Sequence, residues 1–204
     1  MIRWLAASLC LLGLTGCIYI DAEDSVPEER LVISTVKEPI EGVTNPLDLR
    51  RTTLIVQDIE ASLAFYRDAL GMTVAYDQEL TSPGLTSRAN HDGENRSRLV
   101  LLEANNSFIG MLGLWQFLDQ EPVSEQARKV DFTPGNIVLL FNSKTLSETF
   151  PTAASVPGAE ILDEPHERRY PSESGDIVVM VSMLSDPDGH AVELNQLISD
   201  PRRQ

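Results

Sequence analysis

Cysteine is almost missing from this chain of 204 residues, because its two copies, Cys10 and Cys17, both lie near the start. The rest of the chain therefore offers no cysteine nucleophile, no cysteine-bound zinc and no disulfide. The sequence also lacks the Gly-x-Ser-x-Gly, phosphate-loop, dinucleotide-binding and His-Glu-x-x-His motifs. It gives no support to nucleophilic hydrolysis or to nucleotide chemistry.

Positive charge is scarce as well. The 16 lysines and arginines stand against 31 aspartates and glutamates, which gives a formal net charge of −15. This balance argues against a nucleic-acid partner and against charge-driven binding to anionic lipid head groups. It suits a neutral or cationic ligand, but a surface that only keeps the protein soluble is the favoured interpretation.

The first 16 residues have the organisation of an export signal. Arg3 precedes an apolar segment, residues 4–14, which is too short to span a bilayer. The segment ends in Leu14-Thr15-Gly16-Cys17, which resembles the lipobox of bacterial lipoproteins. The resemblance implies removal of residues 1–16 and lipid on Cys17. Because residue 18 is Ile and not Asp, it also implies an outer-membrane anchor facing the periplasm. The alternative is an ordinary signal peptide beside an incidental cysteine.

Composition and pattern then divide the remaining chain. An acidic tether is expected at residues 17–48, a folded domain at 49–198 and a short tail at 199–204. Within the domain one order of elements occurs twice, at about 49–115 and again at about 135–198, with a polar linker between the two. Each unit is predicted to run strand, helix, strand, strand, strand.

The first unit carries the clearer signals. Asp58 is a helix N-cap, Gly71 ends the helix, and the apolar residues between them follow a helical spacing. Its strands are predicted at 52–56, 72–76, 98–102 and 108–114. In the second unit, strands are predicted at 137–141, 159–161, 177–184 and 191–197, with a helix at 145–154 and a polar loop at 164–175.

The last strand of the second unit follows a tight turn, Asp186-Pro187-Asp188-Gly189. Side chains alternate along a strand, so Ala191, Glu193 and Asn195 share one face and Val192 and Leu194 the other. Glu193 is thus a carboxylate among apolar residues, where it needs a partner, a metal or water. His190, beside the turn, is expected to be solvated, and Tyr66 to be part of the helix core.

Several of these segments together resemble the vicinal oxygen chelate superfamily, which includes glyoxalase I, extradiol dioxygenases and bleomycin resistance proteins. The segments are Val56-Gln57-Asp58, Phe65-Tyr66, Leu70-Gly71, Asp186-Pro187-Asp188-Gly189 and Val192-Glu193-Leu194. The resemblance implies an α+β fold in which two βαβββ units pair into a curved mixed sheet around a cavity.

Enzymes of this superfamily hold a divalent metal through side chains on the first and last strands of each unit. The resemblance carries these positions to Arg51, Gly110, Asn136 and Glu193. Arginine stays protonated, glycine has no side chain and asparagine is a weak ligand, so only Glu193 is a usual metal ligand. We therefore expect no metal cofactor and a pair between Arg51 and Glu193 in its place. A divalent metal bound through Glu193 is the alternative.

Three functions remain compatible with the sequence. The first is an envelope-anchored protein that binds a small, mostly apolar molecule without metal, through Arg51, Gly110, Asn136 and Glu193, with a homodimer as a possible form. The second is a glyoxalase-like lyase, isomerase or dioxygenase in which Glu193 is the base and Arg51 stabilises an oxyanion. The third is a structural envelope protein.

Overall fold

The structure is a computed structural model that describes residues 47–81, 96–119, 121, 130 and 132–203. The predicted export signal, Cys17 and nearly all of the predicted tether lie outside the described residues. None of the described helices is long and apolar enough to cross a membrane.

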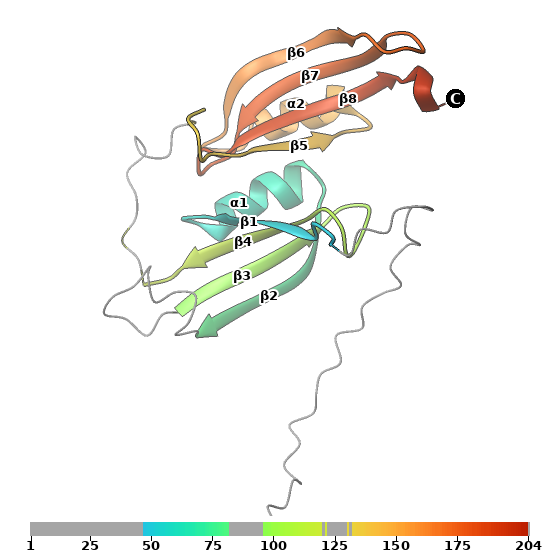
Figure 1. The fold of residues 1–204 in the computed structure, drawn as a ribbon. Helices are drawn as coiled ribbons and strands as arrows, with labels where there is room; N and C mark the ends of the chain where they lie inside the picture. The colour runs from blue at the N-terminus through green and yellow to red at the C-terminus, as the bar shows by residue number, and fades with distance from the viewer. Residues whose placement is uncertain (1–46, 82–95, 120, 122–129, 131, 204) are drawn as a thin grey trace, which may run out of the picture. The chain divides into compact units, whose positions relative to one another are not determined.

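Two βαβββ units make up the domain, and we call them the first and the second unit (Figure 1). The first unit contains β1 (Arg51–Ile55), α1 (Ile59–Leu63) with its π-helical continuation η1 (Ala64–Ala69), β2 (Thr73–Thr81), β3 (Arg96–Glu103) and β4 (Met111–Phe117). The second unit contains β5 (Val138–Asn142), α2 (Leu146–Ala154), β6 (Glu160–Tyr170), β7 (Ile177–Ser185) and β8 (Ala191–Ser199), followed by a 3-10 turn, η3 (Pro201–Arg203).

Each unit forms its own four-stranded mixed sheet. The strand order is β1-β4-β3-β2 in the first and β5-β8-β7-β6 in the second. In both, the first strand runs parallel to the last, and the other pairs are antiparallel. The predicted α+β class and the repeated order of elements are therefore confirmed. Across the described residues the strand pairing stays within the units, because β1 and β5 are both edge strands of separate sheets.

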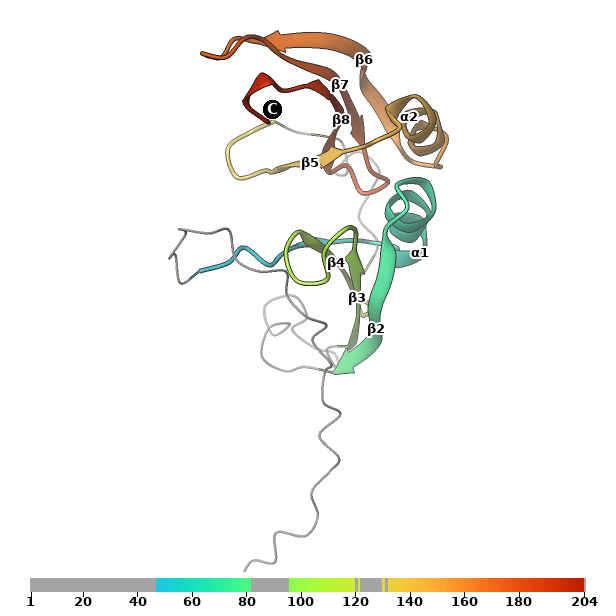
Figure 2. The same cartoon turned by 90° about the vertical axis from the view of Figure 1, so that its right-hand side faces the viewer.

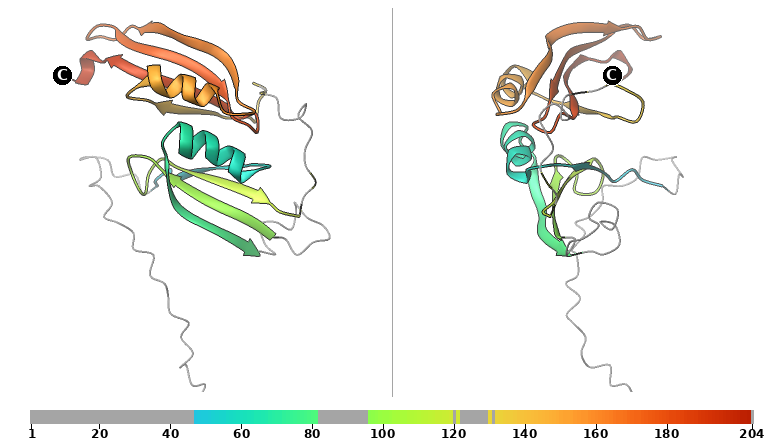
Figure 3. Two further views of the ribbon diagram at one scale, coloured as in Figure 1. Left: turned by 180° about the vertical axis from the view of Figure 1, so that it is seen from behind. Right: turned by 90° about the vertical axis from the view of Figure 1, so that its left-hand side faces the viewer.

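Each helix covers one face of its own sheet, as Figures 2 and 3 show from three sides. The core lies between helix and sheet. In the first unit it contains Leu54, Val100 and Leu114, and in the second Leu184, Val192 and Leu194. Asp58 caps α1 by accepting from the amides of Glu60 and Ala61. The opposite face of each sheet carries the candidate site residues.

Two of the predicted boundaries were wrong. Strand β4 begins at Met111, so Gly110 lies just before the strand, in a turn with φ of 74°. Strand β6 runs to Tyr170, so His166 and Arg168 lie on a strand and not in a loop. Its side chains are mostly exposed, because β6 is an edge strand. An edge strand with a solvent-facing surface need not show the apolar alternation that identifies a buried one.

Candidate functional site

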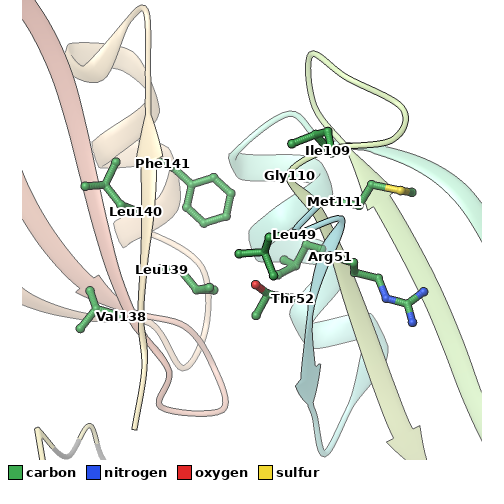
Figure 4. Close-up of a pocket in the computed structure, with 11 residues that line it drawn as sticks. Leu49, Arg51, Thr52, Ile109, Gly110, Met111, Val138, Leu139, Leu140 and Phe141 are labelled. Carbon is green, nitrogen blue, oxygen red and sulfur yellow. The ribbon is translucent and has the colours of Figure 1, made fainter. Parts of the chain in front are cut away.

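The larger of two pockets relevant to the predicted site lies between β5 and the starts of β1 and β4, with a volume of about 470 Å³. Its lining residues are almost all apolar: Leu49, Arg51, Thr52, Ile109, Gly110, Met111, Leu112, Val138, Leu139, Leu140 and Phe141. Leu139 and Phe141 on β5 point toward Leu49 and Thr52 (Figure 4). The pocket is therefore an apolar space between two edge strands.

Arg51 is the one charged residue in this lining. Its guanidinium points away from β5 in Figure 4, over the open face of the first sheet. The side chain lies across β4, where a Cβ added to Gly113 would be 3.3 Å from Arg51 Cδ and 2.8 Å from Thr53 Oγ1. Arg51 therefore borders the apolar pocket and fills space over Gly113.

Glu193 lies in a different pocket, of about 210 Å³, on the open face of the second sheet. Its Oε1 accepts a hydrogen bond from Asn195 Nδ2 at 2.7 Å. No ion pair between Arg51 and Glu193 occurs in the described part of the chain. The expected pair is thus not formed. Arg51 and Glu193 also line different pockets, so this structure does not support the hypothesis that both act on one reacting group.

The other two predicted positions are also separated. Gly110 lines the larger pocket beside Arg51. Asn136 lies before β5, where its backbone N–H donates to the backbone carbonyl of Thr133 at 3.2 Å. It is in the lining of neither pocket. The structure brings together Arg51 and Gly110, and it leaves Asn136 and Glu193 elsewhere.

The residues at these positions do not fit a divalent metal. Within the described ranges no three His, Cys, Asp or Glu side chains gather as a metal-binding group. Glu193 already accepts from an amide, and the position equivalent to it in the first sheet is Gly113. The equivalence follows from register, since Thr53 pairs with Gly113 at the middle of β1, and Leu140 pairs with Glu193 at the middle of β5.

The Asp186–Gly189 turn is a polar cluster whose hydrogen bonds join the two units. Asp186 is fully buried and accepts from Tyr66 Oη at 2.9 Å, while the Nδ1 of His190 lies 2.9 Å from its Oδ2. Asp188 accepts from the amide of Gln57 at 2.9 Å and from Ser62 Oγ at 3.0 Å. The turn before the last strand therefore binds the start of the first helix.

Burial and charge perturb this cluster. Burial, and next the charge of Asp186, raises the pKa of Tyr66, so the phenol stays protonated and donates. Burial acts to lower the pKa of His190, but the hydrogen bond and charge of Asp186 outweigh it, and the pKa is raised. Burial is also the main reason why the pKa of Asp188 is raised.

Sequence reasoning missed the role of this turn. His190 was expected to be solvated, yet its side chain is 24% exposed and contacts a buried carboxylate. Tyr66 is core, as predicted, but its hydroxyl also links the units. The sequence feature that could have identified this cluster is Asp186 itself. An aspartate at the first position of a turn next to an apolar strand is a candidate for a buried carboxylate with hydrogen-bond partners.

The comparisons with known proteins fit this geometry. The model of the Glyoxalase/Bleomycin resistance protein/Dioxygenase superfamily matches residues 48–194. The chain belongs to this superfamily. It is similar in fold to a glyoxalase family protein from Bacillus cereus, at 12% identity and a TM-score of 0.57, covering 81% of this chain and 100% of that one.

Other solved structures of the superfamily resemble the chain more loosely. The trypanothione-dependent glyoxalase I of Leishmania major is 19% identical, with a TM-score of 0.47, over 74% of this chain and 86% of that one. A glyoxalase-related enzyme from Fulvimarina pelagi is 18% identical, with a TM-score of 0.43, over 73% and 87%. No curated protein matches the sequence. The likeness to the Bacillus cereus protein, at a TM-score of 0.57, concerns the fold and leaves the activity open.

Proposed function

We propose that this member of the superfamily binds a small, mostly apolar molecule in the pocket between β1 and β5, without a metal. The observation that carries the proposal is the lining of that pocket. Ten of its eleven residues are uncharged, and the guanidinium of the eleventh, Arg51, points away from β5. A volume of about 470 Å³ lies within the range of small-molecule sites.

The pocket offers surface for binding and few groups for chemistry. Leu139 and Phe141 supply apolar area from β5, and Leu49 and Ile109 supply it from the first unit. Burying this area against a ligand contributes about 25 cal/mol per Å². Among the described residues no carboxylate, histidine or cysteine lines the space, so the hydroxyl of Thr52 has no general base beside it there.

The experiment is a titration of the full-length protein with N-phenyl-1-naphthylamine, a neutral fluorophore that brightens in apolar surroundings. Leu49→Glu places a charge in the lining, and we expect affinity to fall about tenfold or more. Leu47→Glu is the matched control, because Leu47 is 79% exposed, Leu49 is 82% exposed, and only Leu49 lines the pocket. Equal affinity of all three proteins would contradict the proposal.

We propose further that the domain acts at the cell envelope, held by lipid on Cys17. The support is the Leu14-Thr15-Gly16-Cys17 sequence alone. Several acyl chains hold a protein firmly on a membrane, and a protein without them loses that membrane binding. Cys17→Ser should move the protein from the membrane fraction to the soluble fraction. Retention in the membrane fraction would refute the anchor and would leave the pocket proposal standing.

A further inference from the structure

The pocket that contains Glu193 is separate from the apolar pocket and has the opposite character. It lies over β6, β7 and β8 of the second sheet. Val181 and Met183 form its apolar part, and Asp163, Arg168, Tyr170 and Glu193 bring polar groups to it. The lining of about 210 Å³ of space thus contains two carboxylates, one guanidinium and one phenol.

Glu193 is held in place by a neutral neighbour. Asn195, which is 7% exposed, donates from Nδ2 to Glu193 and accepts the amide N–H of Ser182 through Oδ1 at 3.3 Å. The asparagine is thereby fixed at both ends and orients one carboxylate oxygen. An amide does not neutralise a charge, and no ion pair to Glu193 is found in the described ranges. A half-buried, oriented carboxylate without a cation is suited to receive one.

The groups on β6 define the other end of the pocket. Asp163 pairs with Met183, and Met183 pairs with Glu193, so the two carboxylates flank one methionine in a row across three strands. Arg168 lies further along β6, and its Nε donates to His166 Nε2 at 3.1 Å. That hydrogen bond leaves the other guanidinium N–H groups of Arg168 for an acceptor. The pocket thus presents carboxylates at Glu193 on β8 and at Asp163 on β6, and a guanidinium at Arg168 further along β6.

We propose that this pocket binds a small zwitterion, with its ammonium group on Glu193 and its carboxylate on Arg168. A compact ammonium matches the oriented carboxylate, and a planar guanidinium matches a second carboxylate. The apolar residues Val181 and Met183 accommodate the short carbon chain between the charged ends. The proposal concerns a second site, so it does not depend on a ligand in the pocket between β1 and β5.

The test is calorimetric titration of the full-length protein with 4-aminobutanoate, and with 1-butylammonium and butanoate as probes that carry one charge each. We expect 4-aminobutanoate to bind more tightly than either. Glu193→Gln keeps the shape and the bond from Asn195, and it should weaken 4-aminobutanoate and butylammonium at least tenfold. Arg168→Gln should weaken 4-aminobutanoate and leave butylammonium unchanged. Glu164→Gln, an equal change of charge on the same strand outside the pocket, should affect neither.

Several results would overturn the assignment. Absence of binding by 4-aminobutanoate, equal binding by butanoate, or an unchanged affinity in Glu193→Gln would each do so. Stoichiometric, tight binding of Mn²⁺ that Glu193→Gln abolishes would replace the zwitterion with a metal. Melting temperatures of the variants establish that they are folded. The fluorophore titration with Leu49→Glu is unaffected by any of these outcomes, so the two proposals fail separately.

Discussion

The parallel strand pairs β1–β4 and β5–β8 have the same register, but the side chains on the open faces of the two sheets differ. At the middle of the parallel pair, Gly113 in the first unit is covered by Thr53 and Arg51, whereas Glu193 in the second unit borders a pocket. Two residues further on, Trp115 stacks on Phe117 with ring centroids 5.0 Å apart, where the second unit has Asn195. Side chains thus cover the open face of the first sheet, whereas the equivalent face of the second sheet has a polar pocket.

The comparison teaches that repetition of a fold does not repeat a site. The backbone order is set by turns and buried strands, which both units have, whereas a side-chain cap is present on α1 and not on α2. The open face depends on a few side chains that the core does not constrain. A single glycine allows neighbouring side chains to close the first face, and a single asparagine keeps the carboxylate of the second in position.

The largest expected effect tests whether the first face is filled. Gly113→Ala puts a Cβ 2.8 Å from Thr53 Oγ1 and 3.1 Å from its Cγ2. A threonine on a paired strand is stiff, so we expect the free energy of unfolding to fall by about 1–3 kcal/mol. Urea denaturation measures the loss. Thr53→Ala removes both crowded atoms, so the double variant should lose less than the sum of the single variants. Strict additivity would mean that this face has spare room.

The next effect concerns the connection between the two units. Tyr66→Phe removes the hydroxyl that donates to the buried Asp186 and leaves that carboxylate one donor short. We expect a loss of about 1–2 kcal/mol in the free energy of unfolding. Tyr76→Phe on β2 is the control, because it removes the same hydroxyl from a half-buried tyrosine whose side chain makes no hydrogen bond within the described residues. An unchanged urea midpoint in Tyr66→Phe would mean that the bond from Tyr66 to Asp186 does not stabilise the connection, which would then depend on the bonds of Asp188 to Gln57 and Ser62.

A smaller effect should appear in the pH dependence of stability. The folded protein raises the pKa of His190, so the protonated ring stabilises it fully below the ordinary pKa of about 6.5. This contribution is lost as the pH rises from there through the folded-state pKa. Melting temperatures measured from pH 6 upward should therefore fall in the wild type and fall less in His190→Gln. Parallel curves would remove His190 from the connection.

The smallest effect is expected at Glu193. A carboxylate paired with Arg51 in the core would cost several kcal/mol to remove, because the arginine would be left unpaired. The structure forms no such pair, and Glu193→Ala removes only a half-buried side chain and its bond to Asn195. We expect a change of about 1 kcal/mol or less. A loss near that of Gly113→Ala would show that the second face is as tightly constrained as the first.

Much of the fold could be predicted from the sequence because its signals are local. Asp58 and Gly71 mark the ends of the first helical segment, and the alternation around Glu193 gives the correct face of β8. The start of the edge strand β6 was predicted, at residues 159–161, but its continuation to Tyr170 was missed because those exposed residues do not pack into a core. The start of β4 was misplaced because Phe108 and Ile109, though apolar, precede the turn at Gly110.

The candidate site was less predictable because it depends on distances across the sheets. Spacing from Asp58 gave the right strand for Arg51, but not the direction of its guanidinium. The position that matters beside it is Gly113, three residues from the predicted Gly110, and only the register of β1 with β4 identifies it. The role of Asn195 likewise depends on a neighbouring strand, because the backbone N–H of Ser182 on β7 donates to its Oδ1 and fixes the side chain.

The Asp186–Gly189 turn also determines when, during synthesis of the chain, the contacts between the two units can form. Its bonds to Tyr66, Ser62 and Gln57 span 120, 126 and 131 residues, so they form only after nearly the whole sequence has been synthesised. Until then Ser62 and Tyr66 at the first helix lack acceptors that they have in the native state. Contacts this distant in sequence slow folding. A chain that stops before residue 186 should therefore lack both this turn and β8, the strand with which β5 pairs, so that the first sheet can form while the second stays incomplete.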